Sequence, residues 1–104
     1  MVLLEFSMSP LGKGESVSEY VAQSVAIIAE SGLDYRLHAM GTIIEGEWEQ
    51  VFAVVTRCFE VMKQTCPRIS CSIKVDYREG HTGRLESKVK SVTEKISRKI
   101  KTVE

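Results

Sequence analysis

The chain has 104 residues, 43% hydrophobic and 27% charged, which fits one globular domain over residues 1–104. Fourteen basic residues balance fourteen acidic ones, so the surplus of Lys and Arg that neutralises nucleic-acid phosphates is missing, and no nucleic-acid partner is expected. No run approaches the roughly 20 apolar residues of a membrane span, and the N-terminus does not resemble a signal peptide. We therefore expect a cytoplasmic protein with no membrane partner.

The cysteines and histidines give no sign of a catalytic or metal centre. An odd set of cysteines, Cys58, Cys66 and Cys71, indicates free thiols in a reducing compartment. His38 and His81 have no neighbouring ligands, whereas a closed zinc site uses four. Neither His lies in a recognisable catalytic motif, and no Cys carries a nucleophile signature. We expect no enzyme activity, no catalytic residues, no metal and no cofactor.

The first half of the chain reads as a strand, a helix and a strand. Residues 2–9 are apolar and extended, and a loop follows them. Ser16 with Glu19 three residues later predicts a capping box, and apolar residues at helical spacing continue to about Ser31. Gly32 is well placed to end this helix in a left-handed conformation.

The second half repeats the pattern. Strands are predicted at 34–40 and 42–45, a helix from about 47 to 66, the clearest strand at 68–77, and a last helix at 84–101. The order β-α-β-β-α-β with a terminal helix is that of the ferredoxin-like split βαβ motif. It predicts an α+β fold with a four-stranded antiparallel sheet and two helices on one face.

Strand alternation assigns the two faces of this sheet. In the last strand, Ile73 and Val75 are expected to be buried against the helices, with Cys71 on the same side, while Lys74 and Asp76 point away. The second set belongs to an open polar face: Glu5, Ser7, Arg36, His38, Ser72, Lys74, Asp76 and Arg78. This face is either simply solvated or a polar floor shared with a partner.

Two further segments have a structural and a functional interpretation. Met40–Gly46 is either an ordinary hairpin or a binding element, in which Gly41 admits a close backbone, Thr42 supplies a hydroxyl and Glu45 a carboxylate. The last helix carries a narrow apolar stripe, consisting of Leu85, Val89, Val92, Ile96 and Val103 with Ile100 beside it. The stripe packs either on its own domain or on another subunit.

Three segments resemble the small thiamine-binding protein family of bacteria, archaea and yeast. They are Phe6-Ser7-Met8-Ser9-Pro10-Leu11-Gly12, Met40-Gly41-Thr42-Ile43-Ile44-Glu45-Gly46 and Ile73-Lys74-Val75-Asp76-Tyr77-Arg78, and the similarity covers nearly the whole chain. The resemblance implies a ferredoxin-like subunit, a cytosolic homotetramer built as a dimer of dimers, and binding of thiamine or a related pyrimidine without catalysis. Glu15-Ser16 departs from the Ser/Thr-rich stretch of many members.

Thiamine is a cation with an aminopyrimidine ring, and these features select the candidate residues. Glu45 suits the amino group and Thr42 a ring nitrogen, while Trp48 either offers a cation–π contact or simply anchors the core. The candidate ligand-binding residues are Ser7, Gly41, Thr42, Glu45, Trp48, Lys74, Asp76 and Arg78. The alternative function is a regulatory or assembly domain that binds protein through the open face, without a small ligand.

Overall fold

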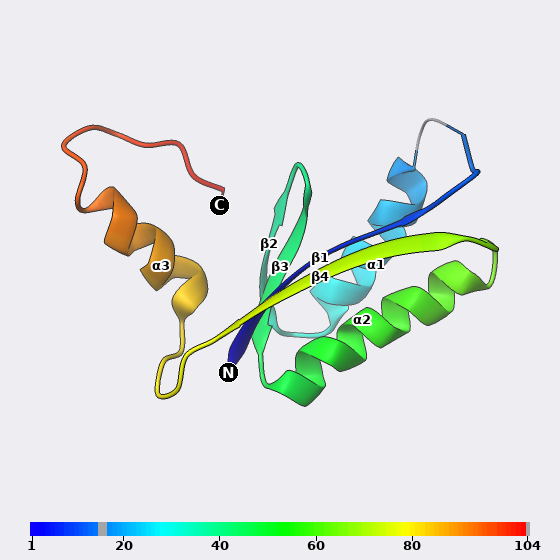
Figure 1. Ribbon diagram of the computed structural model, residues 1–104, viewed down its shortest axis with the longest axis horizontal. Coiled ribbons are helices and arrows are strands. Elements are labelled where there is room, and N and C mark those ends of the chain that lie inside the picture. Colours follow the sequence, from blue (N-terminus) through cyan, green and yellow to red (C-terminus); the bar gives the residue numbers. More distant parts are fainter. Residues whose placement is uncertain (15–16, 104) are drawn as a thin grey trace.

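Seven regular elements follow one another in the computed structural model, which describes residues 1–14 and 17–103 (Figure 1). They are β1 (Val2–Pro10), α1 (Ser18–Glu30), β2 (Asp34–His38), β3 (Gly41–Gly46), α2 (Trp48–Lys63), β4 (Ile69–Tyr77) and α3 (Arg84–Thr93). The predicted element order is confirmed. The predicted cap Ser16 lies outside the described residues.

The strands form one antiparallel sheet in the order β2-β3-β1-β4. The long strand β1 lies between β3 and β4, where Leu3 pairs with Glu45 on one side and with Asp76 on the other. This order and connectivity are those of the ferredoxin-like fold, which the sequence predicts.

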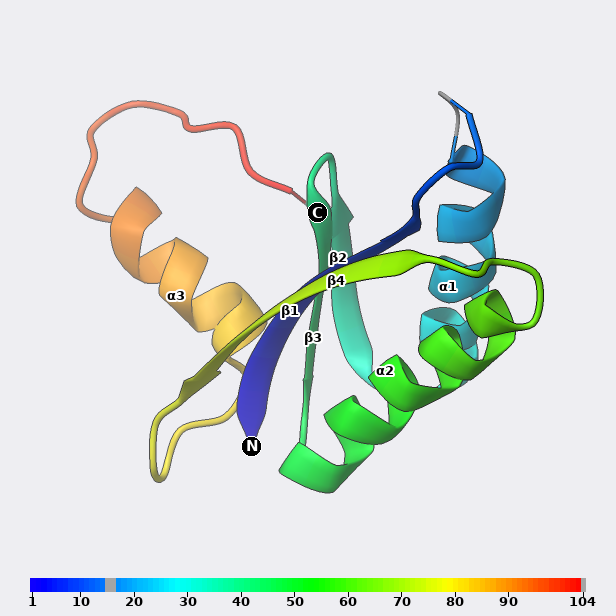
Figure 2. The ribbon, with the colours of Figure 1, turned by 45° about the vertical axis from the view of Figure 1, so that its right-hand side comes forward.

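The core lies between the sheet and the helices α1 and α2, which cover the same face (Figure 2). Alternate residues of β1 supply it, and Leu4 and Phe6 are almost fully buried against residues such as Ile28 and Ile44. Burying an apolar side chain of this size stabilises a fold by about 1.5–3 kcal/mol. The predicted alternation of β1 is therefore confirmed.

The helix ends follow from local residues. Glu47 caps α2 in a capping box with Gln50, whose side chain accepts a hydrogen bond from the Glu47 amide at 2.9 Å. Gly32, with φ of +79°, follows α1 in the left-handed conformation that the sequence predicts.

The strand β4 is the uncovered edge of the sheet, and here one burial prediction is wrong. Ile73 is 44% exposed and Cys71 is also exposed, while Val75 is half-buried against the core. The cause is that α1 packs on β1 and β2, and α2 on β1 and β3, so that the helices stop short of most of β4. Lys74 is not packed under the helices, so the two faces are not exchanged.

The helix α3 lies on the other side of the sheet from α1 and α2 (Figures 1 and 2). It contacts β3 and β2, and Leu85 in its first turn is buried. The predicted helix to residue 101 is too long, because α3 ends at Thr93 and the following segment has no regular structure. Val92 and Ile96 are exposed, and a short helix without tertiary packing is only marginally stable.

Candidate ligand-binding site

A cavity of about 310 Å³ opens where the pairing of β1 with β3 ends, between α1 and the β2–β3 hairpin. This volume is at the lower end of the roughly 300–1,000 Å³ of small-molecule sites. Its lining comes from β1, α1 and the hairpin: Phe6, Ser7, Met8, Ser9, Val17, Val21, Ser24, Val25, Ile28, Leu37, His38, Ala39, Met40, Gly41 and Thr42. We call it the hairpin cavity.

Two buried hydroxyl residues interrupt the apolar wall of the hairpin cavity. Thr42 is 5% exposed and pairs with Phe6 on the helix-covered face of the sheet, and Ser24 is 7% exposed on the inner side of α1. A hydroxyl both donates and accepts hydrogen bonds. Apolar walls with a few fixed polar groups are typical of sites that recognise small organic molecules.

The glycine at position 41 of the cavity wall is explained by the packing of its backbone, and not by contact with a ligand. A Cβ at this position would lie 2.7 Å from the carbonyl oxygen of Phe6, which is closer than real Cβ contacts. The glycine therefore lets β3 approach β1 where their pairing ends at Phe6 and Thr42. The close approach predicted for Gly41 is present, and its partner is the strand β1.

His38 lies at the rim of the hairpin cavity and is held by two neighbours. Its Nδ1 accepts a hydrogen bond from the Met40 amide at 3.2 Å, so the neutral ring carries its proton on Nε2. Nε2 lies 3.1 Å from Oε2 of Glu5, although without good hydrogen-bond alignment. The hydrogen bond from the Met40 amide orients the ring beside the cavity.

The predicted residues Glu45 and Asp76 lie toward the opposite end of the sheet, where they hold α3. Oε2 of buried Glu45 accepts a hydrogen bond from the Arg84 amide at 2.9 Å. Oδ2 of Asp76 accepts hydrogen bonds from Nζ of Lys88 at 2.5 Å and from Nη2 of Arg84 at 2.7 Å. Both donors lower the pKa of the Asp76 carboxyl, and Lys88 has the larger effect.

The remaining predicted residues lie apart from one another. Lys74 is exposed, and it lies opposite Glu5 in the register of β1 and β4. Trp48 begins α2, is 54% exposed and stacks on Phe52 with ring centroids 4.5 Å apart. Arg78 follows β4 and lines a different hollow.

The eight candidate residues therefore do not form one site within a subunit. Ser7, Gly41 and Thr42 line the hairpin cavity, and the other five do not. Thr42 and Glu45 lie on opposite faces of the sheet, so one ligand in a subunit cannot contact both side chains.

Sequence reasoning named only Ser7, Gly41 and Thr42 of the cavity lining, and the residues it missed include Phe6, Val21, Ser24 and His38. The alternation of β1 predicts Phe6 in the core, which is correct, since it is 4% exposed. The core face of the sheet is not closed, because the layer between α1 and the sheet contains the cavity. The available signal was Ser24, a polar residue four positions before Ile28 on the buried side of α1.

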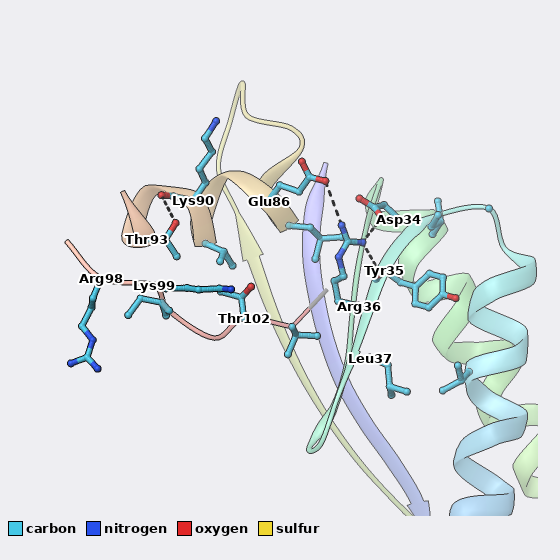
Figure 3. A pocket seen from close by; sticks show the side chains of 17 residues that line it. Asp34, Tyr35, Arg36, Leu37, Glu86, Lys90, Thr93, Arg98, Lys99 and Thr102 are labelled. Atoms are coloured by element: carbon cyan, nitrogen blue, oxygen red, sulfur yellow. Dashed lines mark hydrogen bonds and ion pairs between the residues drawn. The ribbon is translucent and has the colours of Figure 1, made fainter. Parts of the chain in front are cut away.

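A larger hollow separates β2 from α3 and the segment after it (Figure 3). This groove holds about 1450 Å³ and is wider than the sites that usually enclose a small molecule. Arg36 bridges its two walls, with Nη1 2.7 Å from Oδ1 of Asp34 and Nη2 3.5 Å from Oε1 of Glu86. The hydrogen bond that Arg36 donates to the Asp34 carboxylate raises the pKa of Arg36, so this bridge stays charged. We call this hollow between β2 and α3 the α3 groove.

Residues 1–14 and 17–103 contain neither a metal-ligand cluster nor a membrane-spanning helix. In this part of the chain no group of three or more His, Cys, Asp or Glu side chains is arranged to hold a metal ion. None of the described helices has the length and apolarity to cross a membrane. The three cysteines are free, and burial raises the pKa of the Cys58 thiol, which disfavours its reactive thiolate form.

The ferredoxin-like sheet order, with the hairpin cavity between α1 and the β2–β3 hairpin, defines a small α+β protein. The family model described as "Thiamine-binding protein" matches residues 4–93, and the chain belongs to this family. UPF0045 protein Mb1933 of Mycobacterium bovis is 45% identical over 92 residues, covering 88% of this chain and 90% of that protein. The resemblance found in the sequence is thereby confirmed.

Solved structures agree with the fold. The crystal structure of hypothetical protein MJ1052 from Methanocaldococcus jannaschii is 31% identical, has a TM-score of 0.83 and covers 89% of this chain and 96% of its own. A Thermotoga maritima protein, TM0486, provisionally described as acting in thiamine biosynthesis or salvage, has a TM-score of 0.78 at 22% identity, with 88% and 97% coverage. At that identity the likeness supports the fold alone.

Proposed function

We propose that this protein binds thiamine or a related pyrimidine in the hairpin cavity without transforming it, as a carrier or sensor. The observation that carries the proposal is the position of Thr42. This residue of the Met-Gly-Thr segment is buried, and it lines the hairpin cavity together with Ser24. Membership of the thiamine-binding protein family supports the class of ligand.

The chemistry of the cavity suits a flat, mostly apolar ring with a few hydrogen-bonding atoms. The hydroxyls of Thr42 and Ser24 can serve the ring nitrogens and the amino group, since each donates and accepts. Phe6 provides an aromatic face, and a thiazolium cation above such a face gains roughly 0.5–2 kcal/mol. No carboxylate belongs to the described lining, so neutral groups serve the amino group in this proposal.

We also propose that the protein is a cytoplasmic homo-oligomer, a tetramer built as a dimer of dimers. The accessible surface is 7385 Å², whereas a compact monomer of this mass has about 5,900 Å². The radius of gyration is 15.1 Å, against about 13 Å for a compact chain of 100 residues. The excess surface includes the edge of β4 and the exposed stripe of α3, which suit subunit contacts.

A regulatory or assembly domain that binds another protein remains the second candidate. The α3 groove favours it, because it runs along the edge strand β2 beside α3 and is larger than a small-molecule site. In this alternative the occupant is a different protein, and the hairpin cavity holds no ligand.

Titration calorimetry tests the proposed ligand with thiamine, its pyrimidine moiety and thiamine phosphates. We expect Thr42→Val to weaken binding about tenfold, because it removes one buried hydrogen bond worth roughly 0.5–1.5 kcal/mol and leaves a ligand atom unpaired. Valine has nearly the same shape and favours strands, so the variant should fold.

Two variants serve as controls for Thr42→Val. Thr56→Val removes a hydroxyl that donates to the Phe52 carbonyl on the exposed side of α2, and Glu45→Gln alters the other face of the sheet. Both should bind the ligand as the wild type does. Equal affinity of Thr42→Val and the wild type would remove the hairpin cavity from the function, and an effect of Glu45→Gln would place the ligand on the open face.

A further inference from the structure

A third hollow, of about 440 Å³, lies between α3 and the turn that precedes it. Its lining consists of basic and hydroxyl side chains only: Arg78, His81, Arg84, Ser87, Lys88 and Ser91. The last four residues are spaced i, i+3, i+4 and i+7, so they occupy one side of α3. We call this hollow the basic hollow.

The turn from residue 78 to 83 builds the other wall. The His81 amide donates to the Arg78 carbonyl at 3.2 Å, which places these two residues at the ends of one tight turn. Gly80 and Gly83 have φ of +76° and +66°, and they allow the chain to reverse into α3. The turn thus faces Arg78 and His81 toward the same space as the polar side of α3.

Asp76 does not line the basic hollow, but it is bonded to two residues that do. Its Oδ2 accepts hydrogen bonds from Arg84 and Lys88. One carboxylate therefore faces two cations from α3, and Arg78 adds a third positive charge. The lining keeps a net positive charge, which attracts anions.

Arg84 carries the observation that points to a ligand. Its side chain is only 9% exposed, and Nη2 is engaged by Asp76, yet the buried Nη1 has no hydrogen-bond partner among the described residues. Buried donors are normally paired, because an unpaired one loses the bonds that it makes in water. Arg84 lines the basic hollow, so a small shift of its guanidinium offers this donor to an anion bound there.

We propose that the basic hollow binds a phosphate group. Arginine and lysine form short charge-assisted hydrogen bonds with phosphate oxygens, and the hydroxyls of Ser87 and Ser91 add neutral donors. The same chemistry fits inorganic phosphate and a phosphate monoester. The site is separate from the hairpin cavity and does not depend on the proposed thiamine-type ligand.

Calorimetry at constant ionic strength tests this site with inorganic phosphate and with ribose 5-phosphate as a simple monoester. We expect Arg78→Ala to weaken phosphate binding about tenfold, as for loss of one charge-assisted hydrogen bond. Asp76→Asn should tighten it several-fold, because it removes the competing negative charge. Tighter binding of ribose 5-phosphate than of inorganic phosphate would assign the site to a monoester, and the reverse to the free ion.

Arg68→Ala is the matched control, since Arg68 precedes β4 as Arg78 follows it and does not line the basic hollow. Phosphate affinity should be unchanged in this variant. Equal losses in the Arg68 and Arg78 variants, or dissociation constants weaker than about 10 mM for both probes, would overturn the proposal. Thiamine binding by Arg78→Ala should remain that of the wild type, which separates this site from the hairpin cavity.

Discussion

Gly41 determines how closely two strands approach beside the hairpin cavity. The space that its Cβ would occupy is taken by the carbonyl of Phe6, and Phe6 and Thr42 are paired across that approach. Backbone atoms of two central strands cannot move apart without breaking their ladder. The residue thus fixes the position of the cavity wall.

We expect Gly41→Ala to destabilise the fold by about 1–3 kcal/mol, the usual cost of forcing an extra carbon into a packed region. Gly46→Ala is the matched control, because its Cβ would meet the ends of the Leu33 and Gln50 side chains at 3.2 Å, and these can move. Urea unfolding of both variants provides the comparison. A loss at Gly46 as large as that at Gly41 would contradict the backbone clash.

The segment Met40–Gly46 shows how much the sequence predicts about single residues. The sequence predicts Met-Gly-Thr-x-x-Glu as one binding element, yet residues 42 and 45 of a strand differ by an odd number and so face opposite sides. The segment identified the family, and Thr42 lines the cavity. The role of Glu45 was not accessible, because its partner is an amide 39 residues away on α3.

The helix α3 is attached to the sheet through a few polar contacts at its first turns. Glu45 satisfies the Arg84 amide, Asp76 pairs with Lys88 and Arg84, and Arg36 reaches Glu86. A carboxylate near a helix N-terminus also interacts favourably with the helix dipole. The attachment of α3 therefore depends on charge.

Acid should weaken this attachment. The pKa of Asp76 is lowered from 3.8 in the folded protein, so its ionised form stabilises the fold at every pH above that value. The contribution declines as the pH falls below 3.8 and through the lowered folded value. We expect the stability difference between the wild type and Asp76→Asn to be constant from neutral pH to about pH 5, and then to shrink.

Urea unfolding of both proteins from pH 7 to pH 2.5 measures this difference. Glu79→Gln, in the turn after β4, is the control and should follow the wild type more closely through the same range. A difference between wild type and Asp76→Asn that grows on acidification would show that the carboxylate does not stabilise the folded state.

At the level of elements, the sequence predicts the order and faces but not every length. The capped helix α2 and the alternating strand β1 match their patterns because local and tertiary preferences agree. The helix α3 ends eight residues early, since the stripe residues after Leu85, such as Val89 and Val92, stay largely exposed in the single subunit. Periodicity reveals an apolar side but not its partner.

The molecule as a whole has more surface than a compact monomer needs, and we expect an oligomer that uses the stripe of α3. Val92 is 57% exposed in the single subunit. Val92→Glu should place a charge in an apolar contact, which costs several kcal/mol unless the contact opens (about 2–7 kcal/mol even for a neutral polar group). The variant should sediment as a smaller species and keep its circular dichroism.

Analytical ultracentrifugation at micromolar concentration measures this change. Thr56→Glu, which adds the same charge to the exposed side of α2, should leave the assembly intact. A monomeric wild type would disprove the assembly. Unfolding of Val92→Glu would mean instead that the stripe belongs to the core of its own subunit.

The sparse attachment of α3 also has a consequence for the timing of local opening. Amide hydrogens of β1, which lies between two strands, can exchange with solvent only when the sheet opens, whereas those of α3 need only the loss of a few contacts at one end. In a lone subunit α3 would thus exchange its amides well before the sheet does. Association of subunits over the stripe would slow that exchange, so deuterium uptake by α3 would depend on protein concentration.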